Sequence, residues 1–146
     1  MDVETIKKLL NLKPLKQEGG YFHETYRSPI TIRADKLRPG YDGERSLFTV
    51  IYYVLTDNDF SAPHRLNSDE IWLFHRGDPI EIKLTHSDNS QEIVILGNDI
   101  ENGERPQLLI PARTIQSAKL HSTEHHYALV STVVIPGFEY DDFKLI

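Results

Sequence analysis

The sequence contains no cysteine. Disulfide bonds, thiolate metal sites, iron–sulfur clusters and cysteine nucleophiles are therefore excluded together. If the protein binds a metal ion, histidine, carboxylate or amide groups have to hold it.

Long hydrophobic runs and an excess of basic residues are also lacking. No apolar run reaches the roughly 18 residues of a membrane span, and the start, Met1-Asp2-Val3-Glu4, shows no basic region followed by an apolar core. The 22 acidic and 16 basic residues give a formal net charge of -6, which argues against electrostatic binding to nucleic acid or to an anionic membrane. The sequence predicts a cytoplasmic protein with neither kind of partner.

The chain has enough apolar material for one core. Its 146 residues, 39% of them hydrophobic, have the length of one domain, which we place over residues 1–146. Helical spacing occurs only near the start, where Val3, Ile6 and Leu9 recur within Asp2–Leu12. This segment predicts a short amphipathic helix that ends before Pro14.

The rest of the chain predicts β-structure. Short β-branched and aromatic runs alternate with turn residues such as Gly77-Asp78-Pro79, a spacing typical of a closed sandwich or barrel. The run Leu47–Leu55 is apolar on both faces, which indicates a central strand and favours a homodimer. The predicted strands are Gly20–Ser28, Leu47–Leu55, Glu70–His75, Ile80–Thr85, Glu92–Leu96, Gln107–Ile110 and Tyr127–Ile135, with weaker patterns at Ile30–Arg33 and Thr114–Leu120.

The densest group of polar side chains lies between Pro63 and Pro79. Strand alternation places Glu70 on the same face as Trp72 and Phe74. A carboxylate among apolar residues has to be paired, protonated, metal-bound or next to a polar cavity, because an unpaired buried charge is costly. His64 lies an even number of residues earlier, so we expect it to converge on the same cavity. The structural alternative is that Glu70 pairs with Arg65 or Arg27.

These residues carry a family resemblance. The spacing from His64 through Leu66 and Glu70 to Gly77 resembles the first cupin motif, with Leu66 in place of its second histidine. The longer strings Glu18–Ser28, Ser68–Trp72, Gly77–Pro79 and Leu129–Phe138 resemble the small single-domain group called cupin family five. The resemblance implies a double-stranded β-helix, a jelly-roll barrel that follows the short helix, holds its ligand inside and is usually dimeric.

Two departures from the cupin pattern concern metal binding. Leu66 removes one histidine ligand, and Gln116 stands where the last histidine is expected, so the three-histidine, one-glutamate site is lost. The remaining donors, His64, Glu70 and Gln116, form a thin ligand set for a divalent metal. A metal-free site uses them differently: His64 acts as general base, Glu70 orients it and Gln116 hydrogen-bonds the substrate.

A shorter resemblance concerns the ligand. The string Gly20–Tyr26 is similar to an early strand of dTDP-sugar 3,5-epimerases, which implies that Phe22 and Glu24 help bind a nucleotide sugar. We add Tyr26, Arg27 and Trp72 as candidate ligand-binding residues, because a guanidinium group suits phosphate or carboxylate and aromatic rings suit stacking.

Three functions remain open from the sequence. The first is binding of a small metabolite inside the barrel, with metal-independent isomerase or epimerase activity on a sugar or nucleotide sugar. The second is a non-catalytic ligand-binding protein. The third is a degenerate metal-dependent enzyme.

Overall fold

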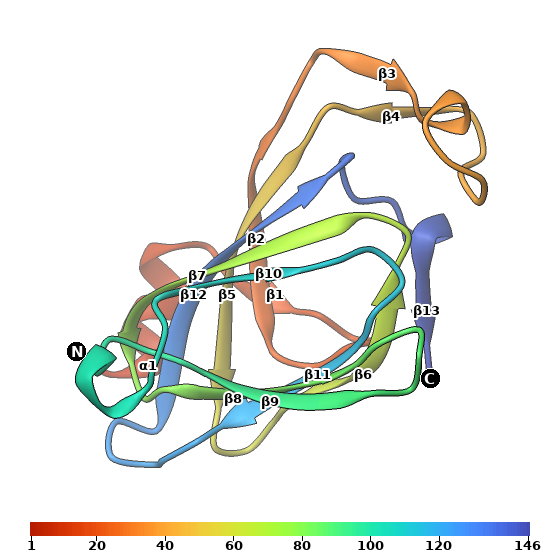
Figure 1. Cartoon of the computed structure of the whole chain (residues 1–146). Coiled ribbons are helices and arrows are strands. Elements are labelled where there is room, and N and C mark those ends of the chain that lie inside the picture. Colours follow the sequence, from red (N-terminus) through yellow and green to blue (C-terminus); the bar gives the residue numbers. More distant parts are fainter.

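The computed structural model describes residues 1–146, and its strands form two facing sheets that close into a jelly-roll barrel (Figure 1). The larger sheet has the order β1-β2-β5-β12-β7-β10 and the smaller one β13-β6-β11-β8-β9. The larger sheet contains β1 (Lys13–Pro14), β2 (Tyr21–Arg27), β5 (Thr49–Thr56), β12 (Tyr127–Ile135), β7 (Asp69–Gly77) and β10 (Gln107–Ile110). The smaller sheet contains β13 (Phe143–Leu145), β6 (Ser61–Leu66), β11 (Ile115–Leu120), β8 (Ile80–Thr85) and β9 (Gln91–Leu96).

The predicted fold class, an all-β jelly roll with a short N-terminal helix, is confirmed. The sequence did not predict the short strands β1, β4 and β13, nor β6, which lies between two other strands of the smaller sheet. Strand β6 carries Pro63, which usually argues against a strand between two others. The structure accommodates this proline because the pairing of β6 with β11 shifts register between its His64 and Ser61 partners, Gln116 and Ala118.

The barrel interior is divided along its strands into a packed hydrocarbon end and an open end, where carboxyl and hydroxyl groups are set among apolar side chains. On β5 the inward residues Tyr53 and Leu55 belong to the main hydrophobic cluster, whereas Thr49 lines a pocket further along the same strand. On β12 the same change separates Val130 from Thr132. One end of the barrel is thus solid core, and the other end has room for a ligand.

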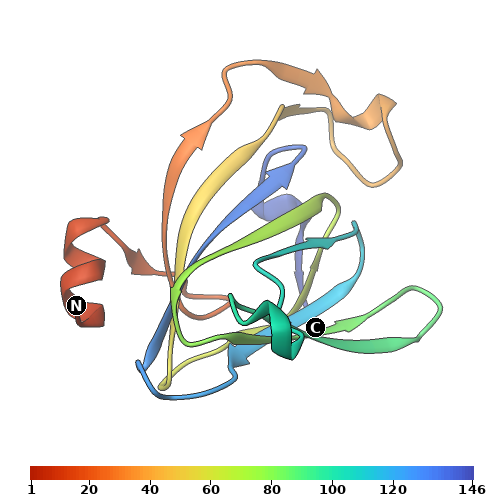
Figure 2. The same cartoon turned by 60° about the vertical axis from the view of Figure 1, so that its left-hand side comes forward.

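Helix α1 (Val3–Leu9) covers part of the outer face of the larger sheet (Figure 2). Asp2 caps it by accepting a hydrogen bond from the Thr5 backbone at 2.8 Å. Ile6 is buried against Val54 and further residues of the sheet. The helix ends earlier than the predicted Leu12, because Asn11 adopts a φ of 56°, outside the helical region.

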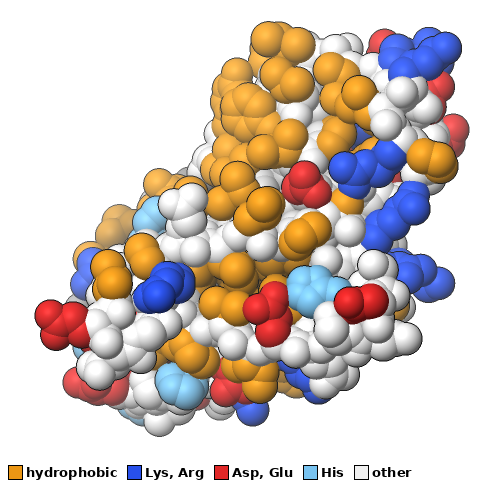
Figure 3. All heavy atoms as spheres, viewed as in Figure 1, with side chains coloured by type: hydrophobic (Ala, Val, Ile, Leu, Met, Phe, Trp, Pro, Cys, Tyr) orange, Lys and Arg blue, Asp and Glu red, His pale blue; other side chains and the backbone are white.

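Strands β3 (Thr31–Arg33) and β4 (Glu44–Ser46) form a separate two-stranded arm that extends beyond the barrel (Figures 1 and 2). Ile30, just before β3, and Leu37, between β3 and β4, have exposed side chains. Figure 3, which has the view of Figure 1, shows hydrophobic side chains gathered over the upper part of the molecule. The homodimer stays a prediction. None of the helices is long and apolar enough to cross a membrane.

The C-terminal segment is tied to this arm by a buried ion pair. Arg45 of β4 donates to both carboxylate oxygens of Asp142, at 2.8 and 3.0 Å, and both side chains are almost fully buried. Asp142 belongs to the short helix η3 (Tyr140–Asp142), and Tyr140 and Phe143 on either side of it line the pocket. The ion pair therefore holds one wall of the pocket in place.

We expect Asp142→Asn to lower the free energy of unfolding by about 3 kcal/mol, because it leaves the buried Arg45 charge without its partner. Urea unfolding measures this change. The matched control is Asp35→Asn, which breaks the exposed pair between Arg33 and Asp35 and should have little effect. Equal effects of the two substitutions would contradict the structural role of the buried pair.

Candidate functional site

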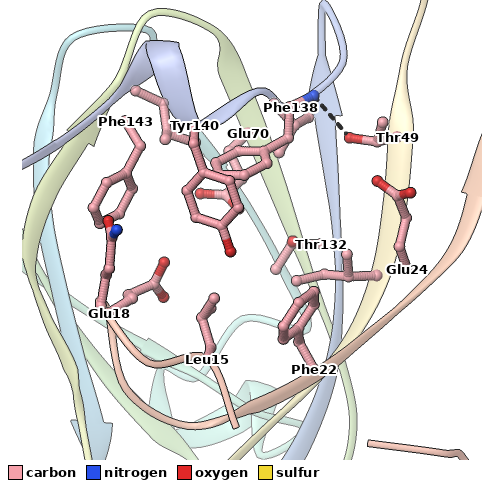
Figure 4. Close-up of a pocket in the computed structure, with 14 residues that line it drawn as sticks. Leu15, Glu18, Phe22, Glu24, Thr49, Glu70, Thr132, Phe138, Tyr140 and Phe143 are labelled. Atoms are coloured by element: carbon pink, nitrogen blue, oxygen red, sulfur yellow. Dashed lines mark hydrogen bonds between the residues drawn. The ribbon is translucent and has the colours of Figure 1, made fainter. Parts of the chain in front are cut away.

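A pocket opens into the end of the barrel that is not filled by the hydrophobic core (Figure 4). Aromatic and aliphatic side chains make up most of its lining, and three carboxylate side chains, Glu18, Glu24 and Glu70, are set among them. Its free volume is about 590 Å3 out to the open mouth. A pocket of this size suits a small ligand.

Glu70 is the buried carboxyl group at the inner side of the pocket. It lies on β7 with only 7% of its surface exposed. Gln116, on β11 of the opposite sheet, donates a hydrogen bond from Nε2 to Glu70 Oε1 at 2.9 Å. Burial raises the pKa of the Glu70 carboxyl group above its ordinary value of 4.5, and the negative charge of Glu18 raises it further. Glu70 therefore keeps its proton to a higher pH than an exposed glutamate does.

Glu18 is a carboxylate of the site that the sequence did not predict, and the same is true of the lining residues Thr132, Phe138, Tyr140 and Phe143. Glu18 lies in the turn between β1 and β2, lines the pocket and accepts a hydrogen bond from the Ser61 hydroxyl at 2.7 Å. Gly19 follows with a φ of +106°, and a Cβ at that position would overlap the carbonyl oxygen of Phe60. The turn that aims Glu18 into the barrel thus needs glycine. The sequence signal for this turn is the pair of glycines, Gly19 and Gly20, that follows Glu18.

His64 lies behind Glu18 and not in the pocket lining. Its side chain is 2% exposed and stacks on Phe143, with ring centroids 5.2 Å apart. Its Nδ1 donates to the carbonyl oxygen of Ala62 at 2.7 Å, which leaves Nε2 facing Glu18 Oε1 at 3.5 Å. Glu18 and the backbone, rather than Glu70, orient this imidazole. His64, Glu70 and Gln116 do lie together, because Gln116 is paired directly with His64 across β11 and β6.

Comparison with known proteins identifies the family. The sequence profile described as Cupin superfamily (DUF985) matches residues 4–146. This chain belongs to the cupin superfamily. It is 34% identical over 138 residues to the uncharacterized protein YML079W of Saccharomyces cerevisiae, a match that covers 89% of this chain and 68% of the yeast protein.

Solved structures agree with this assignment. A hypothetical protein from Leishmania major superimposes with a TM-score of 0.90 at 31% identity, covering 100% of this chain and 88% of that one. A protein from Shewanella oneidensis gives 0.86 at 32% identity, covering 100% and 85%. Oxalate decarboxylase of Bacillus subtilis, an enzyme with Mn(II) centers, shares only the fold, with a TM-score of 0.61 at 14% identity over 93% of this chain and 30% of that one.

The residues of this cupin do not fit a metal ion at the ligand positions. No group of three or more His, Asp or Glu side chains is placed to hold one. Of the three donors named from the sequence, Gln116 turns its amide N–H toward Glu70, and a metal ion needs an oxygen there. The His64 ring nitrogen that remains faces Glu18. Glu70 and Gln116 are thus hydrogen-bonded to each other, and His64 is held by the Ala62 carbonyl oxygen and faces Glu18.

The other predicted ligand residues separate into two groups. Phe22 and Glu24 line the pocket. Trp72 is a correction: it is 1% exposed, packs edge-on against Tyr53 within the hydrophobic core and contributes nothing to the lining. Tyr26 is likewise outside the pocket, where it is half exposed and packs against Phe48.

Arg27 lies at the mouth of the pocket with its guanidinium group already bound. It donates to Glu24 at 2.8 Å, to Glu139 at 2.9 Å and to the carbonyl oxygen of Phe138 at 2.9 Å. These contacts leave it little capacity to hold a phosphate or carboxylate. The alternative pairing of Glu70 with Arg27 or Arg65 is wrong, since the Glu70 partner is Gln116.

The raised pKa of Glu70 predicts a pH dependence of stability. The folded state binds the Glu70 proton more tightly than the unfolded state, so the stability from this group is present below about pH 4.5 and lost as the pH rises through the higher folded pKa. Glu70→Gln removes this titration and keeps an oxygen that accepts from Gln116. We expect the variant to gain stability relative to wild type as the pH rises above 4.5, by about 1.4 kcal/mol for each pH unit of the pKa shift.

Urea unfolding between pH 4 and pH 8 checks this expectation. Glu101→Gln, at an exposed position, is the matched control and should show a constant difference from wild type. A constant difference for Glu70→Gln as well would mean that the Glu70 pKa is the same in the folded and unfolded states.

Proposed function

We propose that this cupin binds a small metabolite inside the barrel and that the Glu70 carboxyl group transfers a proton to or from it without a metal ion. The observation that carries the proposal is a buried carboxyl group with a raised pKa on the wall of an aromatic pocket. General acid–base catalysis works best when the pKa of the group lies near the working pH, and enzymes achieve this for glutamate by burial. Such perturbed groups concentrate at functional clefts.

The surrounding residues support this role for Glu70. Gln116 binds one carboxyl oxygen and fixes the orientation of the group, and the Glu70 side chain lines the pocket. Glu18 lines the same pocket and is backed by His64. An isomerase or epimerase removes a proton from one position and returns it at another, so two carboxyl groups at one pocket match the needs of that reaction class.

A sugar-like carbonyl compound is the substrate class that we propose. Its ring or chain would lie against Phe22 and Phe138, and its hydroxyl groups would reach Glu18 and Glu70. If the substrate is a nucleotide sugar, the small interior holds only its sugar. The nucleotide would then extend past the mouth, where Lys13 and His23 line an outer groove.

One observation favours the non-catalytic alternative. His64 is shielded from the pocket by Glu18 and Phe143, so no imidazole reaches the ligand directly. In that alternative the barrel binds the same metabolite, and Glu70 only hydrogen-bonds it.

Proton exchange separates the two functions. We first screen sugars, sugar phosphates and nucleotide sugars by thermal shift, where a ligand at 100 times its Kd stabilises the protein by about 2.7 kcal/mol. The ligand found is then incubated with the protein in D2O, and NMR follows deuterium at its carbon positions. We expect exchange by wild type and a loss of about 100-fold or more in Glu70→Gln, with Glu101→Gln unchanged. Binding without exchange in wild type removes the enzyme claim, and a screen without any ligand contradicts the proposal.

A further inference from the structure

We infer that the pocket selects a ligand that carries a protonated amine and rejects phosphate and carboxylate groups. This inference rests on the proposed function, since it names the charge of the ligand that binds at the same site. It concerns binding and holds whether or not the ligand is turned over.

The balance of charge inside the pocket is negative. Three carboxylate side chains line it, and no lysine or arginine does. Glu24, at the mouth, is neutralised by Arg27. Deeper inside, Glu18 and Glu70 have only the His64 imidazole as a basic neighbour, and that ring faces Glu18 rather than the pocket. When one of the two carboxyl groups is protonated, the net charge of these three groups is −1 with a neutral imidazole and zero with a charged one. A bound anion would therefore find no net positive charge to compensate it in a desolvated site, whereas a cation would be compensated by the carboxylates.

The basic groups near the mouth do not change this balance. Arg27 is held by two carboxylates and a carbonyl oxygen. The Lys13 ammonium group lies 5.6 Å from the ring centroid of Phe22, in the groove outside the pocket. Neither Arg27 nor Lys13 lines the pocket, so neither one neutralises an anion bound next to Glu70.

An unpartnered hydroxyl group provides an independent observation. Thr132 lines the pocket on β12 and is 2% exposed. Its Oγ1 has no hydrogen bond of normal geometry, although it lies close enough to the Glu70 carboxyl group to counteract the rise of its pKa. Figure 4 shows this hydroxyl group, the Glu18 carboxylate and the Tyr140 hydroxyl group turned toward the same space. An ammonium group has three N–H donors and no acceptor. Glu18, Glu70 and Thr132 offer it three acceptors, which would satisfy the buried hydroxyl group as well.

The walls of the pocket also suit a cation. Four aromatic side chains line it: Phe22, Phe138, Tyr140 and Phe143. The faces of aromatic rings attract cations, and more strongly where water is excluded. The same rings give no such attraction to an anion, so the aromatic lining and the carboxyl groups favour the same charge.

Two sets of three ligands test the inference on the wild-type protein, and the members of each set share a carbon skeleton. Butylamine, butanol and butyrate are titrated at pH 7 by NMR, and glucosamine, glucose and glucose 6-phosphate repeat the comparison on a sugar skeleton. We expect the amine of each set to bind at least about tenfold more tightly than the uncharged member, and the anion to show no binding. The skeleton that binds better shows whether the amine belongs to a sugar or to a simple alkyl compound.

Two variants assign the effect to the pocket. Glu18→Gln and Glu70→Gln should each weaken binding of the amine at least about tenfold while leaving the uncharged ligand within about twofold. The exposed control Glu101→Gln should match wild type for all ligands.

Equal affinity of amine and uncharged ligand, or tighter binding of the anion, overturns the inference but leaves a ligand-binding pocket in place. Absence of binding by every member of both sets overturns the inference too, and in that case the broader ligand screen decides separately whether the proposed function survives.

Discussion

The hydrogen bond from Gln116 to Glu70 joins the two sheets inside the barrel, and the rest of the site depends on it. A carboxyl group at this depth needs either a partner or a proton. The structure provides an amide partner, and the pKa moves in the direction that favours the proton. Thr132 is next to this carboxyl group along the pocket wall, and Trp72 lies beyond it in the core. Glu70 therefore marks the level at which the barrel changes from open pocket to packed hydrocarbon.

The site is assembled from both ends of the chain. The turn before β2 brings Glu18 against β6, where Ser61 and His64 hold it. The C-terminal segment adds Phe138, Tyr140 and Phe143 as the opposite wall, and the buried pair between Arg45 and Asp142 fixes that segment. Stability of the barrel and shape of the pocket are therefore coupled through residues that never touch Glu70.

The strand pattern was readable from the sequence because alternation and turn residues act locally. Ile80–Thr85 and Gln107–Ile110 were predicted with the bounds that the structure has. The cupin spacing also located His64, Glu70 and Gln116 correctly as neighbours in space. Their hydrogen-bond partners were out of reach, because those partners depend on a turn closed by Gly19 and on a register shift around Pro63.

Two causes explain the remaining differences from the sequence predictions: hydrogen bonds between residues far apart in the chain, and the depth of a residue inside the barrel. Arg27 was a candidate anion-binding residue, yet its guanidinium group is bound in part by Glu139, 112 positions away. Trp72 shares a strand face with Glu70, but two residues along that face are enough to pass from the pocket into the core. A pattern in the sequence gives the face on which a residue lies and does not give the depth.

The central claim is that a carboxyl group desolvated inside this cupin barrel, next to a second carboxyl group, is the reactive group of the pocket. The most direct measurement is a site-resolved 13C NMR titration of the Glu70 carboxyl group in the wild-type protein and in Glu18→Gln. The account predicts a Glu70 pKa above 4.5 in wild type and a lower value when the Glu18 charge is removed. A Glu70 pKa at or below 4.5, or one that Glu18→Gln leaves unchanged, would contradict it.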